Sequence, residues 1–284
     1  MSVLRVLNPI RPHIRRLLNV DTEYKLRRSL YRLIPSQNPA PGVHLMHCCS
    51  WKTASQWIRL ILSDPRLYRY HGHVPYLARY TPPAEQLARQ GAMMTSLYWG
   101  AERFVEFRGQ VKGARAFVVV RDPRDLLVSW YFSNRYSHDP MPGLSELSDR
   151  RARMEGMDEE SAINQTIDEF GVVADLLTSW ANFDRTDPDV VLFKYEDLTA
   201  KDNLPLWRSI MSHYGLEVPD AVIARLLDFY AFNNLKSAKR SGSEVGKYRS
   251  GRAGDWRTLM TARNYDHFQS RFGGLATGLG YSAD

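Results

Sequence analysis

The 284-residue sequence predicts an α/β fold in which a central parallel sheet is flanked by helices on both faces. Short apolar runs typical of buried strands occur at Val43–Cys49, Ala114–Val120 and Val190–Phe193. Helical patterns separate these runs, and helical crossovers are what join the strands of parallel sheets. The length suits one domain. We expect that domain over 42–284, preceded by a basic helical arm and linker over 1–41.

The composition is that of a folded globular protein, with 44% apolar residues and a net charge of +7. The basic excess suits an anionic ligand, a nucleic acid or an acidic surface, and does not choose among them. No apolar run approaches the roughly 18 residues of a membrane span, and no signal peptide is visible. The two cysteines, Cys48 and Cys49, are neighbours. We therefore expect packing residues rather than a disulfide, and a cytoplasmic location.

Residues 1–35 form the basic arm, in which arginine and lysine interleave with leucine and isoleucine at helical spacing. We expect an amphipathic segment packed on the domain, with contact to an anionic membrane surface or another polyanion as the open alternative. The stretch from Pro35 to Pro41 ends the arm as a linker.

The first strand leads into the turn Lys52–Trp57, and Ile58–Leu62 continues as a helix with an apolar face. Such a unit points backbone N–H groups and the positive end of the helix dipole at one spot, which suits a phosphate. The glycines of the nucleotide-triphosphatase P-loop are missing, and Lys52 stands at the start of the turn. By itself, the segment fits a phosphate site and a solvent-exposed polar turn about equally well.

The remaining elements are expected as follows. A tyrosine- and histidine-rich stretch covers 68–76, and Pro82-Pro83 starts a short helix. The polar stretch 137–157 contains two prolines and predicts a mobile loop. Further helices are expected at about 126–134, 159–183, 204–214 and 219–230, then a glycine- and serine-rich basic segment at 236–254 and a last helix ending at Gly273-Gly274.

The predicted strand ends carry polar or aromatic residues, and parallel sheets bind ligands outside the carboxyl ends of their strands. Lys52 follows the first strand. Arg121 follows the second, with Ser129 about two helical turns later, where both can reach one phosphate. Tyr195 follows the third and offers a flat ring to a base. The late stretch Tyr248–Trp256 adds arginines that suit phosphate. The alternatives are a simple salt-bridged turn at Arg121-Asp122-Pro123 and a solvated loop in the late stretch.

In this order, the four clusters resemble the motifs of the PAPS-dependent sulfotransferase family. Its members transfer the sulfuryl group of 3′-phosphoadenosine 5′-phosphosulfate (PAPS) to a hydroxyl or amine, on a P-loop-like sulfotransferase fold. The family patterns are Lys-Ser-Gly-Thr-Thr-Trp, Arg-(Asn/Asp)-Pro-(Lys/Arg)-Asp-x-x-x-Ser, Tyr-Glu-Asp-Leu and Arg-Lys-Gly-x-x-Gly-Asp-Trp. The matching segments, within roughly 43–272, are Lys52–Trp57, Arg121–Asp125 with Ser129, Tyr195–Leu198 and Arg249–Trp256.

The resemblance implies a role for each matched residue. Lys52 would act in catalysis by holding the bridging oxygen of the leaving phosphate. The 5′-phosphate would be held by the loop residues Thr53, Ala54, Ser55 and Gln56, through side chains or backbone N–H groups. The 3′-phosphate would be held by Arg121, Ser129, Arg249, Ser250 and Gly251, and the adenine would be surrounded by Trp57, Tyr195 and Phe232. No metal is implied, and the sequence offers no metal-ligand cluster.

The chain departs from the family pattern at two positions. Ala54 replaces the loop glycine, so the turn must accommodate a methyl group. Ser96 stands where cytosolic members carry a catalytic histidine, and serine is a poor base near neutral pH. Glycan and tyrosyl-protein members place a glutamate just past the first helix, which falls near His71–His73 here. We expect His73, or else His71, to be the base; the alternative is that both are surface or acceptor-contacting histidines.

These observations predict a sulfotransferase that moves a sulfuryl group from PAPS to a hydroxyl of a glycan or small metabolite. One alternative is a P-loop kinase-like phosphotransferase, although the Walker lysine and a magnesium-binding carboxylate pattern are missing. The other is a nucleotide- or polyanion-binding module without a base, which Ser96 supports. No nucleic-acid partner is expected, because the basic residues gather at strand ends rather than along one stripe.

Overall fold

The computed structural model describes most of the chain outside the basic arm. The described residues are 29, 31, 33–39, 42–73, 75–76, 91–137, 145–231 and 253–283. The helix expected from Pro82 and nearly all of the basic segment 236–254 lie outside them.

Five parallel strands form the centre of the fold, in the spatial order β2-β3-β1-β4-β5. They are β1 (His44–Cys49), β2 (Pro75–Tyr76), β3 (Met93–Leu97), β4 (Ala114–Val120) and β5 (Val190–Lys194). The chain crosses from one side of β1 to the other between β3 and β4, and ligands bind at such a switch point in open α/β sheets. The predicted α/β class, with a parallel sheet and three of its strands, is confirmed.

Each face of the sheet is covered by its own helices, because successive strand residues point to opposite sides. In β4, Ala116 and Val118 belong to one apolar cluster, whereas Phe117 and Val119 belong to the other. The cluster of Phe117 includes side chains of α4 (Ser55–Leu62), α5 (Pro65–His71), α13 (Leu204–His213) and α14 (Asp220–Phe229). The opposite face is covered by α7 (Ala101–Gln110) and α11 (Gly171–Ala181). Cys48 and Cys49 are buried free thiols, as predicted.

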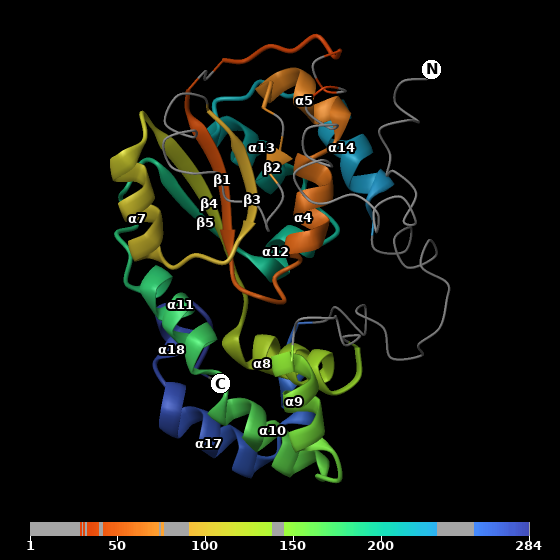
Figure 1. The fold of residues 1–284 in the computed structure, drawn as a ribbon, viewed down its shortest axis with the longest axis vertical. Helices are drawn as coiled ribbons and strands as arrows, with labels where there is room; N and C mark the ends of the chain where they lie inside the picture. Colours follow the sequence, from red (N-terminus) through yellow and green to blue (C-terminus); the bar gives the residue numbers. More distant parts are fainter. Residues whose placement is uncertain are drawn as a thin grey trace.

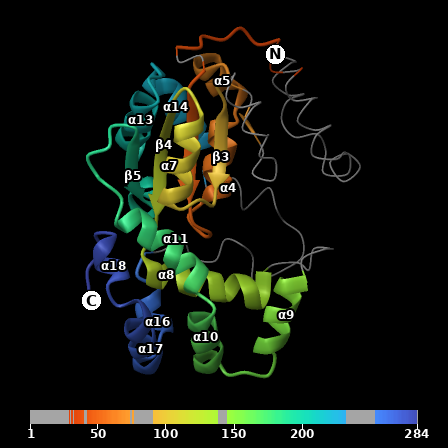
Figure 2. The same cartoon turned by 60° about the vertical axis from the view of Figure 1, so that its left-hand side comes forward.

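A further group of helices lies beyond the carboxyl ends of the strands (Figures 1 and 2). It contains α8 (Pro123–Phe132), the π-helix η1 (Ser133–Ser137), α9 (Ser145–Met154), α10 (Glu159–Asp168), α16 (Trp256–Leu259), α17 (Ala262–Phe272) and α18 (Leu275–Gly278). The short helix α12 (Tyr195–Thr199) directly continues β5. The carboxyl edge of the sheet therefore faces a helical layer, and the motif residues lie where the two meet.

The structure differs from the sequence prediction in several places. The prediction lacks β2 and β3, because β2 has two residues and β3 carries Thr95 and Ser96 among its apolar residues. The stretch 137–157, expected to be a loop, contains α9, which the Arg150–Glu169 and Arg153–Glu169 ion pairs hold in place. The pattern over 159–183 forms two helices, α10 and α11, because the chain turns at the fully buried Phe170.

A few residues of the basic arm are described. Tyr31 is buried, its hydroxyl donates to the carbonyl oxygen of Ser63, and its ring meets that of Tyr68 edge to face at 4.9 Å. These contacts agree with an arm that packs on the domain, while residues 1–28 lie outside the described part. Within that part, none of the helices combines the length and the apolar character needed to cross a bilayer.

Candidate active site

The carboxyl ends of β1, β4 and β5 meet at the side chain of Arg121. This residue follows β4 directly and is 7% exposed. Its Nη1 donates to the carbonyl oxygen of Lys52, 3.1 Å away in the turn after β1. Its guanidinium carbon lies 4.5 Å from the ring centre of Tyr195, the first residue after β5. Lys52 and Tyr195 are 143 positions apart in the sequence. The structure nevertheless brings both to Arg121, at the carboxyl edge of the sheet where they were expected.

The turn after β1 is shaped by its own backbone. Lys52 and Ala54 both adopt left-handed conformations, with φ of 67° and 57°. Ala54 therefore occupies a conformation that favours glycine, the residue of the family pattern. The Thr53 side chain is fully buried, and its hydroxyl donates to the carbonyl oxygen of Ser50 at 2.8 Å. The Thr53 hydroxyl is therefore committed to the turn, and its backbone N–H is the group left to meet a phosphate.

Helix α4 begins at this turn without a side-chain cap. Ala54 is its N-cap residue and provides no capping hydrogen bond. The first N–H groups of a helix together with the positive end of its dipole favour an anion. Lys52, two residues before the cap, adds a positive charge. Gln56 is exposed in the first turn and accepts a hydrogen bond from Arg59 at 2.7 Å.

Ser55, the first residue of α4, is linked to the end of β3. Its Oγ lies 3.1 Å from the hydroxyl of Tyr98, and its carbonyl oxygen accepts a hydrogen bond from Ser96 Oγ at 3.0 Å. The Tyr98 ring stacks on Trp51 with 4.9 Å between centres and 3° between planes. Ser96 therefore uses its hydroxyl to hold the start of α4, a structural role that differs from that of a base.

Trp57 is anchored on the side of the site where the adenine is expected. Its Nε1 donates to the carbonyl oxygen of Tyr230 at 2.9 Å, and its ring meets Trp207 edge to face at 5.5 Å. Trp57 is half-buried, so part of its surface stays available. Phe232 lies outside the described residues, two positions after the Tyr230 carbonyl that Trp57 holds.

The turn after β4 is built around an ion pair. Asp122 caps α8 by accepting the N–H of Arg124 at 2.9 Å. The same carboxylate accepts two hydrogen bonds from the Arg124 guanidinium, at 2.9 and 2.8 Å. Arg124 is fully buried, so it does not face a ligand despite its basic character. Ser129 is half-buried on α8, and its hydroxyl has no hydrogen-bond partner among the described residues. The hydroxyl is therefore available to donate a hydrogen bond to a ligand.

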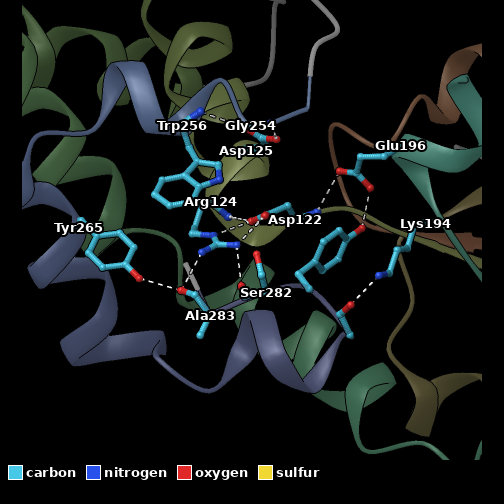
Figure 3. Close-up of polar contacts among 12 residues, drawn as sticks. Asp122, Arg124, Asp125, Lys194, Glu196, Gly254, Trp256, Tyr265, Ser282 and Ala283 are labelled. Atoms are coloured by element: carbon cyan, nitrogen blue, oxygen red, sulfur yellow. Dashed lines mark hydrogen bonds and ion pairs between the residues drawn. The ribbon is translucent and has the colours of Figure 1, made fainter.

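Asp125 ties the late motif to this turn, a contact that the sequence reasoning missed. Its carboxylate accepts the N–H groups of Gly254 at 2.6 Å and Trp256 at 3.0 Å (Figure 3). Gly254 has a φ of 80°, which glycine adopts without strain. Burial raises the pKa of Asp125 above its ordinary value. The predicted ligand residues of this motif, Arg249, Ser250 and Gly251, lie outside the described residues, a few positions before the bonded glycine.

The structure does not bring His73 or His71, the residues predicted to include the base, to the Lys52 turn. His73 packs against Gly91, whose Cβ, if present, would lie 2.8 Å from the His73 ring. Gly91 lies just before β3, at the amino edge of the parallel sheet, whereas Lys52 follows the far end of β1. The six residues of β1 span about 16 Å, so roughly that distance separates the two edges of the sheet. The two histidines lie at the edge opposite Lys52 because α4 and α5 carry the chain back along the sheet (Figure 1).

The donor set at the carboxyl edge suits an anionic nucleotide. Arg121 Nε is buried and has no hydrogen-bond partner among the described residues. The nearby carboxylates are occupied by the protein's own donors: Asp122 by Arg124, Asp125 by backbone N–H groups, and Glu196 by the Tyr281 hydroxyl at 2.7 Å. In the described part of the chain, no group of His, Cys, Asp or Glu residues is arranged to hold a metal ion.

The comparison with solved structures supports the fold. The crystal structure of mouse sulfotransferase SULT7A1 complexed with PAP is 16% identical over 89% of this chain and 92% of that chain, with a TM-score of 0.59. Retinol dehydratase in complex with androsterone and inactive cofactor PAP is 13% identical over 87% of this chain and 83% of its own, at 0.48. The sulfotransferase domain of the Synechococcus PCC 7002 olefin synthase is 15% identical over 88% and 98%, at 0.45.

No curated protein sequence matches the chain. The model of the family described as the sulfotransferase domain matches residues 110–280. The matched region includes Arg121, Ser129, Tyr195 and the late motif, and it begins after the Lys52 turn. Because this match spans more than half of the chain and the fold agrees with it, the chain belongs to the sulfotransferase domain family.

Proposed function

We propose that the protein is a sulfotransferase that takes a sulfuryl group from PAPS and transfers it to a hydroxyl of an acceptor, either a glycan or a small metabolite. The contacts of Arg121 are the main support for this proposal, because its guanidinium contacts both the Lys52 turn and the Tyr195 ring. Membership of the sulfotransferase domain family supports the type of reaction. The PAP bound to the mouse sulfotransferase supports the choice of nucleotide.

The protein's groups would bind and orient PAPS, which supplies the activated sulfuryl group. Lys52 and the uncapped N–H groups of α4 would hold the phosphosulfate, and Arg121 with Ser129 would hold the 3′-phosphate. Tyr195 and Trp57 would hold the adenine, as would Phe232, and the segment Arg249–Gly251 would complete the 3′-phosphate site. A cation beside the leaving phosphate stabilises the charge that develops there, so Lys52 would also lower the barrier.

The acceptor side is proposed from the stacked Trp51–Tyr98 pair. Both rings are half-buried, and Tyr98 is bonded to Ser55 at the start of α4, so the pair lies beside the proposed phosphosulfate position. Flat apolar rings that carry a polar group are well suited to sugars and hydroxylated metabolites.

A nucleotide-binding module without turnover is the second candidate function. Ser96 favours it, because the residue at the family's base position donates its hydroxyl to the Ser55 carbonyl. The described carboxylates at this edge, on Asp122, Asp125 and Glu196, are also engaged. Turnover of radiolabelled PAPS over a panel of glycans, phenols and small alcohols separates the candidates. Transfer to any hydroxyl acceptor supports the sulfotransferase, whereas PAPS binding without transfer to any acceptor supports the module.

Calorimetry with adenosine 3′,5′-bisphosphate (PAP) tests the nucleotide site. The wild type should bind PAP, and Arg121→Ala should weaken binding about ten- to a hundredfold, because an Arg–phosphate bond is worth roughly 1.5–3 kcal/mol. The matched control is Arg115→Ala on the same strand, since Arg115 bonds the His213 carbonyl near the opposite edge. Unchanged affinity in folded Arg121→Ala, or stabilisation by ATP–Mg rather than by PAP, would overturn the proposal.

A further inference from the structure

A segment outside all four motifs contacts the residues that follow β4 and β5. This segment, Gly280–Ala283, comes after α18 and is named the 280–283 segment here. Arg124 donates to the carbonyl oxygens of Ser282 and Ala283, at 2.9 and 3.0 Å (Figure 3). At its other end, the Gly280 carbonyl oxygen accepts a hydrogen bond from Lys194, the last residue of β5, at 2.5 Å.

Arg124 is the centre of these contacts. Its guanidinium pairs with both oxygens of Asp122, reaches two carbonyl oxygens of the 280–283 segment and lies 4.1 Å from the ring centre of Trp256. Figure 3 shows it enclosed between Asp122, Trp256 and this segment. Each nitrogen of the fork has a protein acceptor, and the residue is fully buried, so Arg124 is directed at the protein's own acceptors rather than at a ligand.

A second connection runs through Glu196, in the motif after β5. One oxygen of its carboxylate accepts the backbone N–H of Asp122 at 3.2 Å, and the other accepts the Tyr281 hydroxyl at 2.7 Å. Glu196 is half-buried, and loss of a donor to a partly desolvated carboxylate is costly. Asp122 is therefore held from both sides, by Arg124 on its carboxylate and by Glu196 on its N–H.

We propose that Arg124, Glu196 and Tyr281 are positioning residues of the nucleotide site, acting through Asp122. Asp122 stands between Arg121 and the first turn of α8, so its orientation sets where Arg121 and Ser129 point. The inference rests on the proposed function and deepens it, by assigning the 280–283 segment to the cofactor site without direct contact. Supporting residues of this kind matter because a binding group displaced by about 1 Å loses much of its effect.

Tyr281→Phe is the main test, because it removes one hydroxyl and keeps the ring. Calorimetry should show PAP affinity about three- to tenfold weaker than in the wild type, as a hydrogen bond to a charged group is lost. The matched control is Tyr214→Phe, which removes a buried hydroxyl that donates to the Met46 carbonyl at 2.7 Å on the opposite side of the fold's core. This control should lower the melting temperature and leave PAP affinity unchanged.

Arg124→Lys gives an independent measurement, because lysine keeps the charge but cannot bond four acceptors in a plane. We expect the KM for PAPS to rise about tenfold or more while the KM for the acceptor stays within twofold. Arg108→Lys is the control: it weakens another Arg–Asp pair, with Asp187, far from the motif residues. If Arg124→Lys does not fold, Tyr281→Phe decides. Unchanged PAP affinity in Tyr281→Phe overturns the inference alone, whereas a wild type that does not bind PAP overturns the proposed function and the inference with it.

Discussion

Lowering the pH from 7.5 to 5.0 should destabilise the folded protein, because burial keeps several histidines neutral, His47, His71 and His73 among them. His47 and His71 are fully buried, and His73 is 5% exposed. Burial lowers the pKa of His47 and of His71 to about 3 and that of His73 to about 4. In the unfolded chain, each pKa is close to 6.5. Between these values the unfolded state binds a proton that the folded state does not, so stability falls as the pH falls.

The size of the effect follows from the width of this window. Each histidine costs about 1.4 kcal/mol per pH unit below 6.5, which is about 2 kcal/mol at pH 5.0. Three histidines together cost about 6 kcal/mol, comparable to the whole stability of an ordinary domain. The raised pKa values of Asp125 and Glu196, caused mainly by burial, act in the opposite direction and offset part of the loss.

Urea unfolding at pH 7.5 and pH 5.0 measures the effect, with His73→Gln as the informative variant. Glutamine fills a similar volume and does not titrate, so the variant should lose about 2 kcal/mol less than the wild type between the two pH values. Comparing pH differences removes any general cost of the substitution. Equal pH dependence in His73→Gln and the wild type would refute the reasoning.

Two further changes test the turn after β1. Lys52→Ala should lower kcat by about a hundredfold or more, with a smaller loss of PAP affinity, because its charge acts most on the leaving phosphate; equal losses in kcat and affinity would mean that Lys52 only binds. Ala54→Gly should raise the free energy of unfolding by about 1 kcal/mol, because Ala54 has a φ of 57°. Urea unfolding measures the second change, and a loss of stability would contradict the left-handed turn.

The fold could be predicted where a strand is buried on both faces. β4 reads Ala-Arg-Ala-Phe-Val-Val-Val, and a run of this kind is hard to mistake. β3 could not be recognised in the same way, because Thr95 and Ser96 interrupt its apolar residues. Ser96 is tolerated there because its hydroxyl and its N–H each find a partner, the Ser55 carbonyl and His47 Nδ1. These partners are distant in sequence, so no local pattern could indicate them.

The candidate site could be predicted where a motif directly follows a strand, since the direction of a parallel strand fixes the edge at which its last residue emerges. Lys52, Arg121 and Tyr195 meet this condition. His73 does not, because two helices separate it from β1 and return the chain to the amino edge. Arg124 shows another limit: its residue type suits phosphate as well as that of Arg121 does, and its complete burial is what assigns it to the protein's interior.

The acidic residues beside the proposed ligand groups determine which cation is available to a ligand. If Asp122 paired with Arg121, an incoming phosphate would have to displace a carboxylate, and much of the gain from the Arg–phosphate bond would be lost. Instead Asp122 pairs with Arg124, and no carboxylate of the described residues lies within ion-pair distance of Arg121. The buried Arg124 thus serves the site by occupying Asp122. It follows that Arg124→Met should weaken PAP binding for two reasons: the turn is loosened, and the Asp122 carboxylate becomes able to compete for Arg121. Arg124→Lys should weaken PAP binding less, because lysine can still pair with Asp122.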